Sequence, residues 1–217
     1  MIPIAREGWP VIAVAAGVFG VVGVVGAAAG HPVALLPLLV AVAFCLYFFR
    51  DPERHPPPGE ELVVSPADGR VLEVVAGREE QFLRAPATRV SIFMSPLDVH
   101  VNRSPVAGTI ELVRHTAGKF RAAFADKASL DNERNAVVLE SAGRRYVVVQ
   151  IAGAMARRIV CPRRPGERLA RGERFGMIMF GSRVDLFLPP DVEPRVTRGD
   201  RVTAGQTVVA QIRRGVR

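Results

Sequence analysis

The chain has 217 residues, which allows one or two domains, and its formal charge is +8. Residues 144–217 hold sixteen arginines against six acidic residues, a balance that favours an anionic partner such as a membrane surface. Composition gives no support to nucleic-acid binding, because aromatic residues do not interleave with these arginines as a stacking platform would require. It also gives none to a structural metal, because the two cysteines and four histidines lack metal-ligand spacing.

Two apolar segments open the chain, residues 9–30 and residues 32–49, and neither contains a charge. Crossing a bilayer takes ~20 apolar residues, so the pattern predicts a helical hairpin in the membrane. Whether the first segment, rich in Gly and Ala, spans the membrane or lies in it stays open. Arg6 precedes the hairpin, and Arg50 and Arg54 follow it, which predicts that both ends are cytoplasmic. A cleaved signal peptide is the alternative, but it predicts a single apolar segment.

A stiff linker with four prolines follows at residues 52–59. Beyond it, short β patterns alternate with turn signals. We predict a mainly β fold, a β-sandwich or flattened barrel with lipoyl-like hairpins, behind the N-terminal helical membrane hairpin. The predicted domains are a membrane anchor at 1–50, a linker at 51–61 and a β domain at 62–217. The predicted strands are 62–64, 70–75, 89–94, 109–113, 136–140, 145–151, 183–188 and 207–212.

Two stretches of the β domain look like one turn and strand used twice: Ser65-Pro-Ala-Asp-Gly-Arg-Val71 and Ser104-Pro-Val-Ala-Gly-Thr-Ile110. A third, residues 198–208, has the rhythm of a biotinyl/lipoyl-type hairpin. Carrier domains of that type are modified on a lysine at a hairpin tip. The two lysines, Lys119 and Lys127, do not lie in such a tip, so the carrier hypothesis is not supported. A non-catalytic, membrane-anchored lipoyl-like β adaptor remains an alternative, and it would run as one chain on a gel.

The pair Gly181-Ser182 stands between apolar runs, so Ser182 is expected in or beside a buried strand. On these residues alone, a glycine bulge beside an inert serine explains the pattern. The whole run Arg174-Phe-Gly-Met-Ile-Met-Phe-Gly-Ser-Arg-Val-Asp-Leu-Phe-Leu-Pro189, however, resembles the processing site of phosphatidylserine decarboxylase proenzymes. It is most similar to the short bacterial and archaeal type, in which arginine, here Arg183, follows the serine. Three more stretches match in the family's order: Ser65 to Val71, Met94-Ser-Pro-Leu-Asp-Val-His-Val-Asn-Arg103 and Asn132-Glu-Arg-Asn135.

The resemblance implies a pyruvoyl-dependent lyase of phospholipid biosynthesis. Decarboxylating an amino acid requires an electron sink, and the family makes one from its own chain instead of using PLP or a metal. The Ser182 hydroxyl would attack the carbonyl of Gly181, and β-elimination and hydrolysis would leave a pyruvoyl group at residue 182. The autocatalytic cleavage would give a beta chain, 1–181, and an alpha chain, 182–217. The ketone would then form a Schiff base with the serine amine of the lipid.

The resemblance also suggests site residues. His100 and Asp68 lie in matching motifs, and a histidine held by a carboxylate is the usual general base. Relatives have a second histidine where this chain has Arg103, so either His100 serves both cleavage and decarboxylation or the base comes from elsewhere, with His115 as one alternative. Without the resemblance, Asp68 reads as a turn residue and His100 as a core histidine. Glu133, Asn135 and Arg103 are assigned supporting or substrate-binding roles.

The implied substrate is phosphatidylserine, converted to phosphatidylethanolamine and CO2 at the cytoplasmic membrane, with the catalytic domain facing the cytoplasm. Archaetidylserine is an alternative substrate, because head groups are shared and tails are not read in the sequence. A homodimer would fit the family. We also expect the arginines between residues 157 and 174 to seat the domain on anionic lipid.

Overall fold

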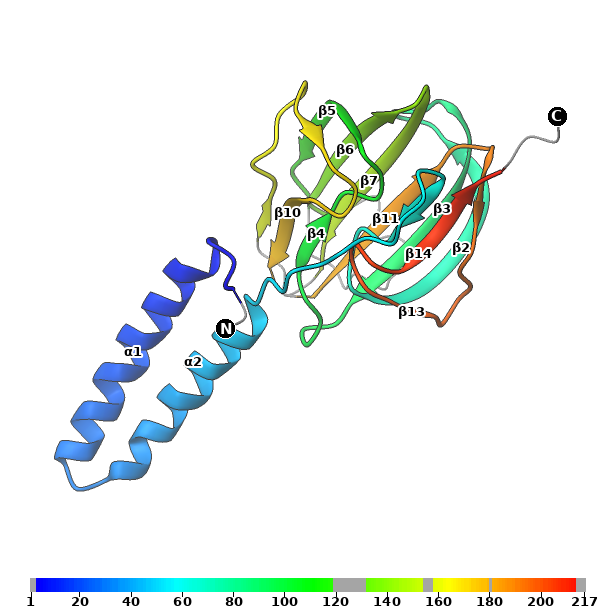
Figure 1. Cartoon of the computed structure of the whole chain (residues 1–217). Helices are drawn as coiled ribbons and strands as arrows, with labels where there is room; N and C mark the ends of the chain where they lie inside the picture. Colours follow the sequence, from blue (N-terminus) through cyan, green and yellow to red (C-terminus); the bar gives the residue numbers. More distant parts are fainter. Residues whose placement is uncertain (1–2, 119–131, 154–157, 180, 214–217) are drawn as a thin grey trace. The chain divides into compact units, whose positions relative to one another are not determined.

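The computed structural model describes residues 3–118, 132–153, 158–179 and 181–213, and it divides into two compact units, Met1–Glu53 and Arg54–Arg217 (Figure 1). Lys119, Lys127 and Arg157, which the sequence analysis singled out, lie outside the described residues.

The N-terminal unit is a helical hairpin, made of α1 (Gly8–Ala28), the short 3-10 helix η1 (Pro32–Leu35) and α2 (Leu36–Phe48). Small residues let the helical segments approach closely: a Cβ added at Gly26 would lie 2.3 Å from the Cβ of Ala34. Valines and leucines along both helices are exposed, which suits lipid better than water. The predicted helical hairpin is present. Among the described residues, one helix, α1, is long and apolar enough to cross a membrane by length and composition, whereas the second apolar helix, Val33–Phe48, is shorter.

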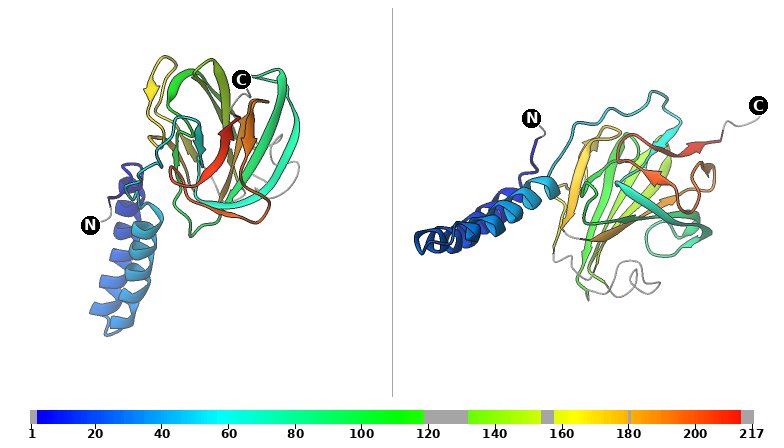
Figure 2. Two further views of the ribbon diagram at one scale, coloured as in Figure 1. Left: turned by 45° about the vertical axis from the view of Figure 1, so that its right-hand side comes forward. Right: turned by 90° about the horizontal axis from the view of Figure 1, so that it is seen from below.

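The C-terminal unit is mainly β, as predicted. Its largest sheet has eight antiparallel strands in the order β13-β2-β3-β11-β7-β6-β5-β9, and it curls as the views in Figure 2 show. Two three-stranded sheets, β1-β14-β12 and β4-β10-β8, pack on it. The strands are β1 (Leu62–Val64), β2 (Gly69–Glu79), β3 (Ala85–Met94), β4 (Val101–Arg103), β5 (Gly108–Thr116), β6 (Arg134–Ser141), β7 (Arg144–Ala152), β8 (Arg158–Val160), β9 (Arg168–Leu169), β10 (Arg174–Met179), β11 (Ser182–Leu188), β12 (Val192–Pro194), β13 (Arg201–Val202) and β14 (Val208–Ile212).

The main core lies between the large sheet and the two small ones. Alternate residues of the central strand β11, namely Val184, Leu186 and Leu188, are fully buried in it. Arg183, Asp185 and Phe187 point to the opposite face, because successive side chains of a strand alternate. All eight predicted strands are present, most of them longer than predicted. The sequence analysis missed β4, β8, β9, β10, β12 and β13.

The predicted repeat is confirmed as two turns with the same hydrogen bonds. Ser65 Oγ donates to the carbonyl of Ala67 at 2.7 Å, and Ser104 Oγ donates to the carbonyl of Val106 at the same distance. The two turns also bind each other, since Val64 N donates to Pro105 O and Arg103 N donates to Pro66 O. Equivalent contacts recur outside them: Gly205 N donates to Ser65 O, and Gly172 N donates to Ser104 O, both at 2.8 Å. The β unit is therefore built around a local two-fold repeat.

Candidate active site at Gly181-Ser182

Ser182 is the first residue of the central strand β11, and it is fully buried. In the sheet register it lies opposite Met94 of β3 on one side and Ala152 of β7 on the other. Gly181, just before the strand, has φ +54°, a left-handed conformation that glycine adopts at little cost. The carbonyl of Gly181 accepts a hydrogen bond from Gly153 N at 3.1 Å. The expected position of Ser182 is confirmed, and its backbone is held on both sides.

A chain of buried polar side chains leads to the Ser182 hydroxyl. Ser182 Oγ donates to Met94 Sδ at 3.3 Å, and Asn102 Nδ2 approaches the same sulfur at 3.7 Å. Gln150 Nε2 donates to Asn102 Oδ1 at 2.8 Å, and Asn135 Nδ2 donates to Gln150 Oε1 at 2.9 Å. Because buried amides need partners, this chain fixes their orientation in the core. It connects Asn135, one of the expected supporting residues, to the serine.

His100 is also fully buried, in the segment that leads into β4. Its Nδ1 lies 2.9 Å from the carbonyl O of Asp98. A carbonyl can only accept, so Nδ1 carries the proton and Nε2 is the basic nitrogen of the neutral ring. The backbone carbonyl of His100 accepts a hydrogen bond from Ile178 N in β10, the strand that leads to Gly181. The sequence segment of His100 is therefore paired with the segment that precedes the candidate cleavage site.

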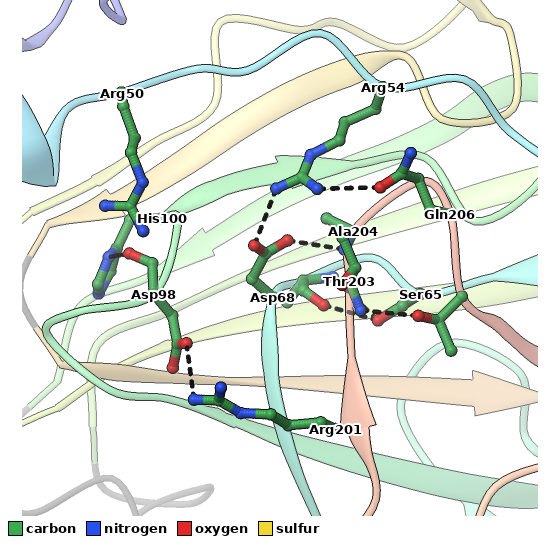
Figure 3. Close-up of polar contacts among 12 residues, drawn as sticks. Arg50, Arg54, Ser65, Asp68, Asp98, His100, Arg201, Thr203, Ala204 and Gln206 are labelled. Carbon is green, nitrogen blue, oxygen red and sulfur yellow. Dashed lines mark hydrogen bonds and ion pairs between the residues drawn. The ribbon is translucent and has the colours of Figure 1, made fainter. Parts of the chain in front are cut away.

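Asp68 faces a different set of groups (Figure 3). Its Oδ2 lies 3.0 Å from Arg54 Nη2, and its Oδ1 accepts a hydrogen bond from Ala204 N at 2.7 Å. We expected Asp68 to hold the His100 imidazole, but these bonds join Asp68 to Arg54 and His100 to the carbonyl of Asp98. Asp68 is not required by its turn, because the sister turn has the same geometry with Ala107 at the equivalent position. The Asp68 carboxylate instead holds Arg54 and Ala204 N, and it stays a candidate for function.

The remaining predicted residues are spread more widely. Arg103 Nη1 donates to the carbonyl of Gly172 at 3.1 Å. The Glu133 carboxylate lies 3.5 Å from Nε2 of the half-exposed His115. The structure therefore brings Asn135 into the polar chain that reaches Ser182, whereas the Glu133 and Arg103 side chains make these other contacts.

Arg183, the residue after the serine, is buried in a charged cluster on the other face of the sheet. Its guanidinium bonds to Asp185 through two nitrogens, at 2.6 and 2.9 Å, and also donates to Ser91 Oγ. Glu73 and Arg89 extend the cluster. A cavity of about 360 Å³ lies on this face, and Arg89, Arg134 and Asp185 are among the residues that line it. Ser182 faces the core, so the cavity does not open onto its hydroxyl.

Sequence reasoning assigned no role to several residues of the site: Met94, Asn102, Asn132, Gln150 and Gly153. A signal was present for Gln150, which is the polar residue in the apolar run of β7. Asn102 and Asn132 lay inside the matching motifs. Their contacts depend on which strands become neighbours, and the sequence alone does not give that. Among the described residues, no cluster of three His, Cys, Asp or Glu side chains could hold a metal ion.

Comparison with known proteins agrees with this geometry. The family model "Phosphatidylserine decarboxylase" matches residues 41–210. Proteins named "Phosphatidylserine decarboxylase proenzyme" match nearly the full chain: one from Ralstonia nicotianae is 49% identical over 96% of this chain and 95% of the relative. One from Cupriavidus taiwanensis is 47% identical, and one from Ralstonia pickettii is 48% identical, with the same coverage of both chains. The chain therefore belongs to the phosphatidylserine decarboxylase family and is a carboxy-lyase.

Proposed function

We propose that the chain cuts itself between Gly181 and Ser182 and then decarboxylates phosphatidylserine to phosphatidylethanolamine and CO2. The observation that carries this proposal is the placement of Gly181-Ser182. The serine is buried, its neighbouring carbonyl is held by a backbone N–H, and a left-handed glycine precedes it. The relatives' name, a decarboxylase proenzyme, supports processing into two chains. The proposed cut would make these residues 1–181 and 182–217. It favours catalysis over a non-catalytic adaptor.

The pyruvoyl group of this family would arise from Ser182 itself, and it would supply the electron sink for decarboxylation. The residues around position 182 fit such a group, because Met94 and Ala152 hold the start of β11 from both sides. His100 is our candidate for proton transfer, since its Nδ1–H bond to Asp98 leaves Nε2 basic. Asp68, with Arg54 and Ala204 holding its carboxylate, is the second candidate.

We further propose that residues 1–50 anchor the enzyme in the cytoplasmic membrane, with the β unit on the cytoplasmic side. The exposed apolar helix α1 supports an anchor, and Arg6 before the hairpin and Arg50 after it support the orientation. A reporter fused after Arg217 should be active only in the cytoplasm. Activity of that reporter in the periplasm would reverse the orientation.

Intact mass measurement tests the central proposal. The purified active protein should give two chains whose masses correspond to residues 1–181 and 182–217, the shorter one beginning with a pyruvoyl group. Ser182→Ala should give one full-length chain without decarboxylase activity. An active wild-type protein that remains one chain of 217 residues would overturn both the cleavage and the pyruvoyl group.

A further inference from the structure

One peptide unit, the bond between Ala152 and Gly153, faces the carbonyl that Ser182 would attack. Gly153 N donates to the carbonyl O of Gly181 at 3.1 Å. This bond continues the β7–β11 ladder one step beyond the pair Ser182 and Ala152. The register that seats the serine therefore also places a buried N–H on the neighbouring carbonyl.

Asn132 holds the other end of the same peptide unit. Its Nδ2 donates to the carbonyl O of Ala152 at 2.7 Å, and only 1% of the residue is exposed. Three groups thus lie in series: the Asn132 amide, the peptide between residues 152 and 153, and the carbonyl of Gly181. Hydrogen bonds in such a series polarise one another, so a bond at the carbonyl end of a peptide strengthens its N–H as a donor.

We propose that the N–H of Gly153 stabilises the oxyanion of self-cleavage and that Asn132 is its positioning residue. This inference rests on the proposed cleavage at Gly181. In that step, the Ser182 Oγ forms a bond to the Gly181 carbonyl carbon and gives its proton to a base. The carbonyl oxygen takes the negative charge, which then returns as the C–N bond breaks and the Ser182 nitrogen is protonated. The products are an ester and a free amine.

The proposed role of the Gly153 N–H depends on the negative charge that develops on the Gly181 oxygen during cleavage. A hydrogen bond to the neutral carbonyl is worth little net, but it strengthens when that oxygen becomes an anion in a buried site. Loss of one such donor typically slows acyl transfer by about 10²–10³-fold. If the bond only supported the sheet, its removal would lower the free energy of unfolding and leave the cleavage rate unchanged.

Substitution at residue 153 can remove the N–H. In the full-length chain, Gly153→Pro lacks this N–H and should cleave about 10²-fold more slowly. Since proline also alters the backbone, the sharper variant replaces Gly153 by its hydroxy acid, glycolic acid, during cell-free translation. This exchange turns one amide into an ester without adding a side chain, and cleavage should slow by a similar factor.

Combining Asn132→Ala with the ester chain tests whether Asn132 acts through the N–H of Gly153. Asn132→Ala should slow cleavage by about tenfold in the normal chain, but it should slow it little further in the ester chain, because the donor it positions is gone. Ser104→Ala is the matched control: it also removes a buried 2.7 Å bond to a backbone carbonyl, and it should leave the cleavage rate unchanged.

The outcomes are distinct. If the ester chain cleaves at the wild-type rate, the N–H of Gly153 has no role in cleavage and the inference is wrong. If Asn132→Ala slows the normal and ester chains equally, Asn132 does not act through that N–H. If the wild-type chain itself is never cut at Gly181, the proposed function fails instead, before any variant is compared.

Discussion

The Ser182 hydroxyl is hydrogen-bonded to the Met94 thioether, with 3.3 Å between Oγ and Sδ, across the paired strands β11 and β3. A thioether is a weak acceptor, so it orients the hydroxyl without removing its proton. We predict that Met94→Leu cleaves within about threefold of the wild-type rate and costs less than about 1.5 kcal/mol of folding free energy, because the two side chains have similar volumes. A time course on denaturing gels checks this prediction. If cleavage stops in Met94→Leu while the protein stays folded, the sulfur has an active part in the reaction.

Asp68→Ala should fold with some loss of stability, because Ala204 N and Arg54 lose their carboxylate partner. It should lose processing, decarboxylation or both, by at least about 10²-fold. The sister turn, which has Ala107 at the equivalent position, shows that the turn forms without a carboxylate. Thermal unfolding and a decarboxylation assay on the same preparation would separate folding from function. Ala107→Asp, which adds a carboxylate at an exposed position of the sister turn, is the control and should change neither. Full turnover by Asp68→Ala would remove Asp68 from the active site.

His100→Ala should likewise impair cleavage or decarboxylation, because it removes the imidazole whose Nδ1 is fixed on Asp98. Measured in parallel, the two rates address a question that the sequence leaves open. Loss of cleavage would place His100 in the cleavage step, and decarboxylation would then be lost as well, because no pyruvoyl group would form. Loss of decarboxylation alone would place the cleavage base elsewhere. Normal rates for both steps would contradict any role of His100 in catalysis.

Arg183 and Asp185 form a buried pair, with side chains only 4% and 2% exposed. Arg183→Met should destabilise the fold by about 3–5 kcal/mol, because it leaves the Asp185 charge buried without its main partner. Adding Asp185→Leu should recover much of that loss. Urea unfolding in the uncut Ser182→Ala background would measure both. A single-variant cost below about 1 kcal/mol would show that Arg89 alone satisfies the carboxylate.

The arginine-rich stretch before the cleavage site divides into two groups. Arg163 bonds to Glu173 and to the carbonyl of Arg174, and Arg171 bonds to the carbonyls of Pro57 and Gly59. The side chains of Arg163 and Arg171 are therefore hydrogen-bonded within the β unit, whereas Arg164 and Arg168 are exposed. We predict that, in a chain shortened to residues 51–217, Arg164→Gln with Arg168→Gln weakens binding to anionic vesicles, at ~1 kcal/mol per charge. Salt should weaken binding of the unsubstituted chain in the same way, and equal vesicle binding by both chains at low salt would show that these arginines are only surface.

Features that depend on neighbouring residues could be predicted from the sequence, whereas contacts between residues far apart in the chain could not. The strands of residues 136–140 and 145–151 were predictable, because their apolar runs and the turn between them are local. Strand β10 was missed because its apolar residues run on toward Gly181 and look like one segment with β11. Ser182 and His100 were found through motifs, but the bond from Gln150 to Asn102 joins residues 48 positions apart. The pairing of Asp68 with Arg54 was missed for a different reason: Arg54 lies in the proline-rich segment, which reads as a linker.

The position of β11 has a consequence for the mature protein. β11 lies between β3 and β7, and β14 lies between β1 and β12. A cut before Ser182 would leave β11 and β14 in a short chain whose sheet partners β1, β3 and β7 belong to the long one. The two pieces would stay interleaved through ladder bonds and through Val184, Leu186 and Leu188 in the core. Unfolding would then release two molecules from one, so by mass action the unfolding midpoint would rise with protein concentration, whereas that of uncut Ser182→Ala would not.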